Sequence, residues 1–99
     1  MKDAKSIYMK SGKHIYPSGA EVWYKDGVYH RDDEPAIIEK DGFKAWFVRV
    51  ERHREDGPAI IYANGLKAWI LHGKHYLFDE WFQETTAEGK ISFLFSGDE

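Results

Sequence analysis

Two short phrases in this sequence combine side chains that enzymes use together. Each phrase has the order His-Arg-x-Asp, and the two copies comprise His30, Arg31 and Asp33, and then His53, Arg54 and Asp56. Histidine can act as a general base, aspartate can orient it, and arginine can hold an anion. One hypothesis is therefore a small hydrolase or nuclease that uses His53, Arg54 and Asp56.

The same phrases also fit a structural role. An active site is normally needed once, whereas a turn is needed in every copy of a repeat, and neither phrase contains a serine or threonine nucleophile. Aspartate, glycine and proline favour turns for local backbone reasons. Glu34 stands where the later copy has Gly57, so no glycine-only conformation is expected there. We therefore predict a structural turn motif made of His30, Arg31, Asp33, Pro35, His53, Arg54, Asp56, Gly57 and Pro58.

The phrases belong to a longer internal repeat with a period of 23 residues. His30 matches His53 at this offset, Trp46 matches Trp69, and one more step back reaches Trp23. The first and last units of repeat arrays are commonly atypical, and the last one serves as a cap. The sequence thus predicts a single domain over residues 1–99, with a degenerate repeat at 1–29, full repeats at 30–52 and 53–76, and a cap at 77–99.

Turn signals within the repeat indicate antiparallel β-hairpins. Asn64-Gly65 and Asp41-Gly42 lie between apolar runs, where such dipeptides favour type I′ turns. A second set of turns is expected at Asp26-Gly27 and His72-Gly73. Arg49-Val50 occupies the equivalent place in the middle copy, and because valine is unfavourable at positive φ, we expect a different or longer turn there.

Strand alternation separates two faces of the predicted sheet. One face is expected to form the core, and it carries Val22, Tyr24, Phe43, Ala45, Phe47, Leu66, Ala68 and Ile70. The other face has one tryptophan per copy, so stacking of the copies places Trp23, Trp46 and Trp69 in a row beside Lys44 and Lys67. Two arrangements are open: the C-terminal segment covers this row, or the row is exposed and binds a partner.

The C-terminal segment departs from the hairpin pattern. Residues 78–85 predict a short helix with Asp79 at its N-cap, and Gly89 is expected to end it. Residues 90–95 are predicted to form a final strand. The expected fold is therefore mainly β: an antiparallel meander of stacked hairpin repeats of about 23 residues, with a short C-terminal helix and a final strand.

Composition and charge exclude several classes of site. The chain has 99 residues, a formal net charge of −3 and no cysteine, which excludes disulfides and cysteine-based zinc sites. The negative charge disfavours a nucleic-acid partner, although tryptophans beside lysines could stack bases. His53, His72 and His75 lack the spacing of a known metal site, and no glycine-rich phosphate loop is found, so we expect no metal and no cofactor. Without a signal peptide or a membrane-spanning apolar run, we expect a cytoplasmic protein with no membrane partner.

The stretch HREDGPAIIYANGLKAWILHGKHY at residues 53–76, followed by FDEWF, resembles small tailed-phage proteins built from His-Arg-x-Asp-Gly-Pro-Ala repeats. Those proteins are similar in style to MORN (membrane occupation and recognition nexus) repeats, whose hairpins stack side by side. The resemblance covers roughly residues 13–84 and names no catalytic residues. It implies an elongated β-meander that serves as a platform for proteins or lipids, a viral source, and a location in the host cytoplasm. The glycine-rich and Tyr-x-Gly positions of MORN repeats are mostly missing here, so lipid binding is not carried over.

The function expected from these features is a small non-enzymatic protein-interaction module, such as a phage accessory or counter-defence protein that binds and modulates a host protein. Tryptophan, tyrosine and arginine are favoured anchors of interfaces. The candidate partner-binding residues are Trp23, Tyr24, Trp46, Trp69, Arg49, Arg52 and Lys67. The partner would be a host or viral protein. A further alternative is a self-assembling structural protein, because the unpaired edge strands of an open meander permit homo-oligomers.

Overall fold

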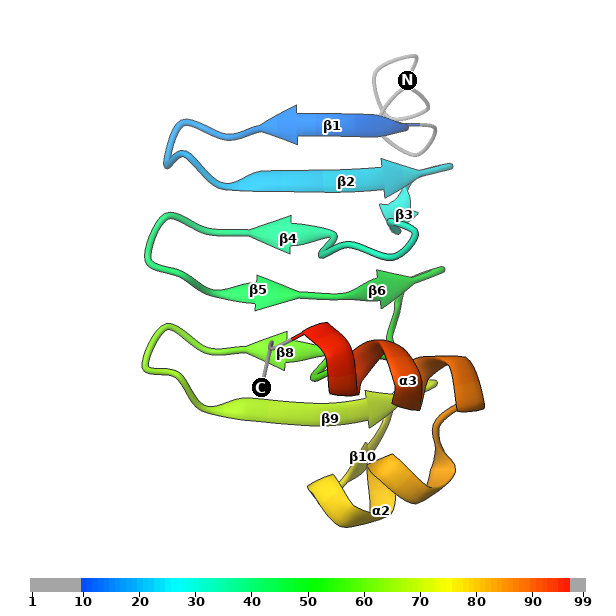
Figure 1. Ribbon diagram of the computed structural model, residues 1–99. Helices are drawn as coiled ribbons and strands as arrows, with labels where there is room; N and C mark the ends of the chain where they lie inside the picture. Colours follow the sequence, from blue (N-terminus) through cyan, green and yellow to red (C-terminus); the bar gives the residue numbers. More distant parts are fainter. Residues whose placement is uncertain (1–9, 97–99) are drawn as a thin grey trace.

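The structure is a computed structural model that describes residues 10–96. An antiparallel sheet has the strand order β1-β2-β4-β5-β8-β9-β10, with β3 paired to β2, while β6 and β7 pair with each other. The hairpins stack in one direction, and the molecule measures 47 × 25 × 21 Å (Figure 1). The predicted antiparallel meander is confirmed. The elements are β1 (Gly12–Ile15), β2 (Glu21–Lys25), β3 (Val28–Tyr29), β4 (Ile37–Ile38), β5 (Lys44–Ala45), β6 (Phe47–Val48), β7 (Glu51–Arg52), β8 (Ile60–Ile61), β9 (Lys67–Leu71), β10 (Lys74–Tyr76), α2 (Phe78–Glu84) and α3 (Ala87–Ser96).

Tyr62 and Leu66 extend the pairing of β8 with β9, so the loop that closes this hairpin contains three residues, 63–65, not two. The Gly65 N–H donates to Tyr62 O at 2.9 Å, and the Tyr62 N–H donates to Leu66 O at 2.8 Å. Gly65 has a φ of 93°, whereas Asn64 is not left-handed and its side-chain oxygen accepts from the Leu66 N–H at 3.1 Å. The hairpin is where it was expected, but the predicted type I′ turn is wrong, because the geometry is a turn followed by a left-handed glycine. The equivalent left-handed residues of the earlier hairpins are Gly19 and Gly42.

The turns at the opposite ends of the hairpins each contain two left-handed residues. The φ angles are 52° at Arg49 and 72° at Val50, close to the 49° and 79° of His72 and Gly73. The expectation of a different turn at Arg49-Val50 is therefore wrong. The Val50 N–H donates to Tyr29 O at 2.9 Å, a bond to the preceding hairpin that holds this turn in the same shape as its neighbours.

Neighbouring hairpins are joined by backbone hydrogen bonds that recur with the repeat. The Trp23 N–H donates to Ala36 O at 2.8 Å, and the Trp46 N–H donates to Ala59 O at 2.7 Å. Both alanines are completely buried, so a larger side chain at either joint would force the hairpins apart. Leu66 departs from the predicted core because it is exposed beside the last hairpin loop. The main core comprises Ala36, Ala45, Phe47, Ala59, Ile60 and Ile70.

Two helices follow the sheet. Helix α2 begins at Phe78, after an extended Leu77 whose N–H donates to Glu80 Oε1 at 3.1 Å; Asp79 lies in the first turn and is not the N-cap. Residues 87–96 form α3, so the predicted final strand at 90–95 is wrong. Within residues 10–96, no helix has the length and apolar content that crossing a membrane requires.

Gly89 lies inside α3 because the helix approaches the third repeat very closely at this point. A Cβ atom on residue 89 would overlap the backbone carbonyl of Glu55. One turn later, Phe93 is buried beside Leu71 and Trp81 in a second, smaller core. Figure 1 shows α3 in front of the β8–β9 end of the sheet, away from β1 and β2.

Candidate functional site

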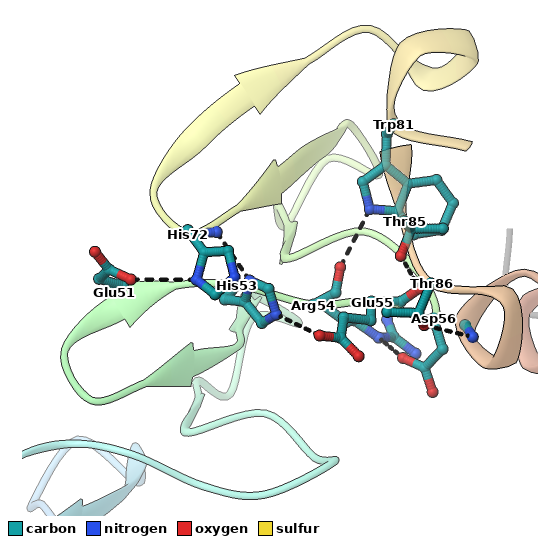
Figure 2. A network of polar contacts seen from close by, with 10 residues as sticks. Glu51, His53, Arg54, Glu55, Asp56, His72, Trp81, Thr85 and Thr86 are labelled. Atoms are coloured by element: carbon teal, nitrogen blue, oxygen red, sulfur yellow. Dashed lines mark hydrogen bonds and ion pairs between the residues drawn. The ribbon is translucent and has the colours of Figure 1, made fainter. Parts of the chain in front are cut away.

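The histidine of each His-Arg phrase, defined as residues 30–35 and 53–58, binds the backbone of the next two-residue turn. His53 Nδ1 accepts a hydrogen bond of 2.8 Å from the His72 N–H, and His30 Nδ1 accepts one of 3.0 Å from the Arg49 N–H. His53 Nε2 lies 3.1 Å from Glu55 Oε2 (Figure 2). Because Nδ1 accepts a backbone N–H, the ring proton is on Nε2, which donates to the carboxylate.

Both ring nitrogens of His53 are thus engaged within the fold. A general base needs a lone pair directed at its substrate, and the lone pair of His53 is directed at the His72 amide. The side chain is also buried. This arrangement links one hairpin to the next, and proton abstraction by His53 would require the turn to open.

The arginine of each phrase stacks on the tryptophan of the preceding hairpin. Arg54 Cζ lies 3.9 Å from the centroid of the Trp46 ring, and Arg31 Cζ lies 3.7 Å from that of Trp23. The Arg54 Nη1 also donates to Pro58 O at 3.1 Å. A cation–π contact is worth roughly 0.5 to 2 kcal/mol, more as it is desolvated, so these stacks stabilise the joint between hairpins.

The carboxylate that orients the arginine differs between the two copies. Arg54 Nε donates to Asp56 Oδ1 at 2.9 Å, whereas Arg31 Nη2 lies 2.9 Å from Glu34 Oε1. Asp33, the counterpart of Asp56, has a left-handed φ of 62°. Gly57 is not left-handed, but a Cβ atom there would lie 2.6 Å from Arg54 Cζ, so the glycine leaves room for the guanidinium.

Aromatic residues of the C-terminal segment take the place of arginine over the third tryptophan. The Trp69 ring lies 4.9 Å from Phe78, 4.8 Å from Trp81 and 5.7 Å from Phe93, measured between ring centroids. Such pairs contribute roughly 0.5 to 1.5 kcal/mol beyond the area they bury. The cluster therefore closes the open end of the repeat array.

The cap is attached to the backbone of the second His-Arg phrase (Figure 2). The indole N–H of Trp81 donates to Arg54 O at 3.1 Å, and Thr85 Oγ1 donates to Glu55 O at 2.6 Å. The Thr86 hydroxyl accepts from the Gly89 N–H at 2.9 Å and so caps α3 beside this contact. These bonds explain why residues after position 84 fold back onto the phrase.

The predicted row of tryptophans is not an open surface. Trp46 is only 7% exposed beneath Arg54, so its expected use as a surface anchor is wrong. Trp69 is partly buried under the C-terminal segment, which is one of the two arrangements that the sequence left open. Trp23 is half-buried under Arg31. The exposed candidates are Arg49, Arg52 and Lys67.

Tyr24 is half-buried on β2, and its hydroxyl lies 2.5 Å from the Tyr16 hydroxyl. Burial, followed by the hydrogen bond to Tyr16, raises the pKa of Tyr24 to about 12. Its ring centroid lies 5.6 Å from that of Tyr29, which in turn lies 5.1 Å from Phe47. Tyr24 thus connects the first hairpin to the second.

A groove of about 400 Å³ lies between α3 and the two His-Arg phrases. Its carboxylates are Asp32, Asp33, Glu55, Asp56 and Glu88. Among residues 10–96, no group of three His, Cys, Asp or Glu side chains is placed to hold a metal ion. The groove brings the predicted chemical residues together. His53 is bonded to the His72 N–H of the next turn and to Glu55, and Arg54 donates to Asp56 and to Pro58 O.

A surface that the sequence analysis missed lies on the outer sides of α2 and α3. We call it the cap surface, and it consists of Leu77, Phe78, Phe82, Ile91, Leu94 and Phe95. Phe82 is half-buried and the other five are exposed. A depression of about 410 Å³ between the two helices is lined by Phe78, Phe82 and Leu94. The helical spacing of residues 91, 94 and 95 carries the signal for this surface, but only once the segment is known to be a helix.

Carboxylates dominate the charge of the cap. Residues 77–96 contain four acidic side chains and one basic side chain, Lys90. Asp79 lines the depression, and Glu88 lies three residues before Ile91 and seven before Phe95 on α3, so it borders the same stripe. The Lys90 Nζ lies 5.6 Å from the centroid of the Phe82 ring.

None of the known protein-family models, curated proteins or solved structures matches this chain.

Proposed function

We propose that this protein is a small non-enzymatic protein-interaction module whose contact surface is the cap surface. The observation that carries the proposal is the exposure of large apolar side chains on α3 and at the start of α2: 86% at Phe95, 65% at Leu94, and 72% at Leu77, the residue before α2. Contiguous exposed apolar patches on a small protein are typical of sites that another molecule covers. The repeat sheet then acts as the scaffold that holds the two helices.

The contacts of the His-Arg phrases support a scaffold role for the sheet and a binding role for the cap surface. The side chains that looked catalytic are engaged in links between hairpins, and those links also provide the carbonyl groups to which Trp81 and Thr85 attach the cap. A rigid base under an exposed apolar surface reduces the entropy lost on binding. The resemblance to phage proteins favours a host protein as the partner and the host cytoplasm as the location.

Self-assembly through the sheet edge is less well supported. Lys13 on the edge strand β1 occupies the repeat position that is alanine at the two internal joints, Ala36 and Ala59. Those alanines are completely buried, whereas Lys13 is exposed and pairs with Glu21 at 3.4 Å. A lysine at the joint position of an edge strand opposes pairing with another copy.

The test compares Leu94→Asp with Leu66→Asp, because both leucines are 65% exposed but Leu66 lies away from the cap. The full-length wild type and both variants are used to purify proteins from cells that contain the natural protein. We expect a protein that is retained by the wild type and by Leu66→Asp and lost with Leu94→Asp. After purification, the retained protein should bind the wild type directly. Its Kd for Leu94→Asp should be at least about tenfold higher than its Kd for the wild type.

Equal retention by the two variants would contradict the proposal, as would the absence of any retained protein. Circular dichroism of Leu94→Asp should match that of the wild type, because an exposed side chain contributes little to stability.

A further inference from the structure

The acids that border the cap surface indicate the chemistry of its partner. We infer that the cap surface binds a protein segment that presents apolar side chains flanked by lysine or arginine. This inference rests on the proposed function and adds to it the class of partner.

The depression between the helices provides the apolar part of the site. Phe78 and Phe82 are four residues apart on α2, and Leu94 faces them from α3. The depression has a volume of about 410 Å³ and is open to solvent, so a side chain of a partner can enter it. An apolar side chain of the partner would therefore be buried against two phenylalanine rings and a leucine.

The polar border provides the charge. Asp79 lines the depression itself, and Glu88 borders the stripe on α3. Neither carboxylate forms an ion pair with another residue in the described part of the chain. Lys90 is the single basic residue within 77–96, and its Nζ already lies 5.6 Å from the centroid of the Phe82 ring, whereas Arg31 and Arg54 line the groove on the other side of Glu88. Unpaired carboxylates beside an apolar surface favour a partner with complementary cations, which increase both the association rate and the specificity.

The same negative charges oppose two other partners of the cap surface: a second copy of this chain and an anionic lipid membrane. In a symmetric dimer the cap of one copy would face the cap of the other, so two surfaces with four acids and one base each would be brought together. An anionic lipid surface would repel the acidic border in the same way. A short amphipathic segment of another protein, laid between two helices, avoids both penalties.

The experiment measures binding of the full-length protein to two synthetic peptides by isothermal titration calorimetry. Both peptides form amphipathic helices with the same leucines, and the polar positions are lysine in one and glutamate in the other. We expect the lysine peptide to bind at least about tenfold more tightly, with a preference that decreases as salt is added. The double substitution Asp79→Asn with Glu88→Gln should remove most of this preference.

A matched double variant, Glu39→Gln with Asp41→Asn, removes the same charge from the exposed β4–β5 loop. It should keep the preference of the wild type. If it loses the preference as well, total charge and not the border of the cap surface is responsible, and the inference is wrong.

The remaining outcomes separate the inference from the proposed function. Equal affinity for the two peptides, or no binding of either, overturns the inference that the partner is basic. Binding to phosphatidylcholine–phosphatidylserine vesicles in place of the lysine peptide, or dimerisation abolished by Leu94→Asp in sedimentation, also overturns it. If the lysine peptide binds Leu94→Asp as tightly as the wild type, the cap surface is not the contact, and the proposed function fails together with the inference.

Discussion

The Nδ1 atom of His53 accepts a hydrogen bond of 2.8 Å from the backbone N–H of His72, nineteen residues later in the chain. The equivalent bond between His30 and Arg49 joins the preceding pair of hairpins at 3.0 Å. The first residue of each His-Arg phrase therefore binds a turn of the next hairpin. A motif that resembles an active site is explained here by the need to satisfy one backbone amide per repeat.

His53→Ala should lower the free energy of unfolding by about 2 to 3 kcal/mol, because it leaves the turn amide unpaired and empties a buried site. His53→Asn should recover part of this loss, since its side-chain oxygen can accept the amide. Urea unfolding measures both. His75→Ala removes an exposed histidine and should change stability by less than about 0.5 kcal/mol. An equally small effect of His53→Ala would show that the link is dispensable.

The positions of the hairpins could be predicted because they depend on local sequence. Turn dipeptides and alternating apolar residues act within a few positions of one another. The turn type could not be predicted in the same way. Asn64-Gly65 is compatible both with a two-residue turn and with a three-residue loop, and the pairing of Tyr62 with Leu66 decides between them.

Val50→Gly should stabilise the protein by about 1 kcal/mol. A branched residue at a φ of 72° is strained by roughly 1 to 3 kcal/mol, and the greater chain entropy of glycine in the unfolded state offsets part of the gain. Val28→Gly is the matched control, because Val28 is an exposed valine in β3 that is not left-handed. It should destabilise the protein. Thermal unfolding of both variants checks the sign, and destabilisation by Val50→Gly would argue against strain at this turn.

The helix expected at residues 78–85 is confirmed as α2, but α3 was a part of the fold that the sequence could not predict. Ile91, Phe93 and Phe95 alternate as they would on a strand, whereas Gly89 and Phe93 have helical spacing. The choice between strand and helix depends on the carbonyl of Glu55, which is distant in sequence and accepts a hydrogen bond from the Thr85 hydroxyl. The cap surface was missed for the same reason.

Strand alternation predicts which residues share a face of the sheet, but it does not predict which side chains cover that face. Arg54 reaches back over Trp46, and Phe78 and Trp81 cover Trp69. The side chains that cover the tryptophans belong to loops and helices. The directions of these segments depend on tertiary contacts, which the local sequence does not reveal.

Tyr24→Phe should reduce the loss of stability at alkaline pH. Burial raises the pKa of Tyr24 to about 12 from an ordinary value of 10.0, so the fold favours the neutral hydroxyl. This contribution is fully present below pH 10 and is lost as the pH rises towards 12. Urea unfolding between these pH values should show a shallower decline for Tyr24→Phe than for the wild type. Tyr62→Phe removes an exposed hydroxyl as a control, and an identical decline in both variants would contradict the assignment.

Gly89→Ala should release the cap from the sheet. Helix propensity alone predicts that alanine stabilises α3 by about 1 kcal/mol. The clash with the Glu55 backbone acts in the opposite direction. A Cβ atom at residue 89 would overlap Glu55 O, and overpacking against rigid backbone costs typically 1 to 3 kcal/mol or more. We expect faster amide hydrogen exchange throughout α2 and α3 while the amides of β4 and β5 stay protected, because the attachment through Thr85 depends on the same carbonyl. Ser92→Ala, on an exposed position of α3, should leave exchange unchanged. A more stable Gly89→Ala variant would mean that α3 does not lie against Glu55.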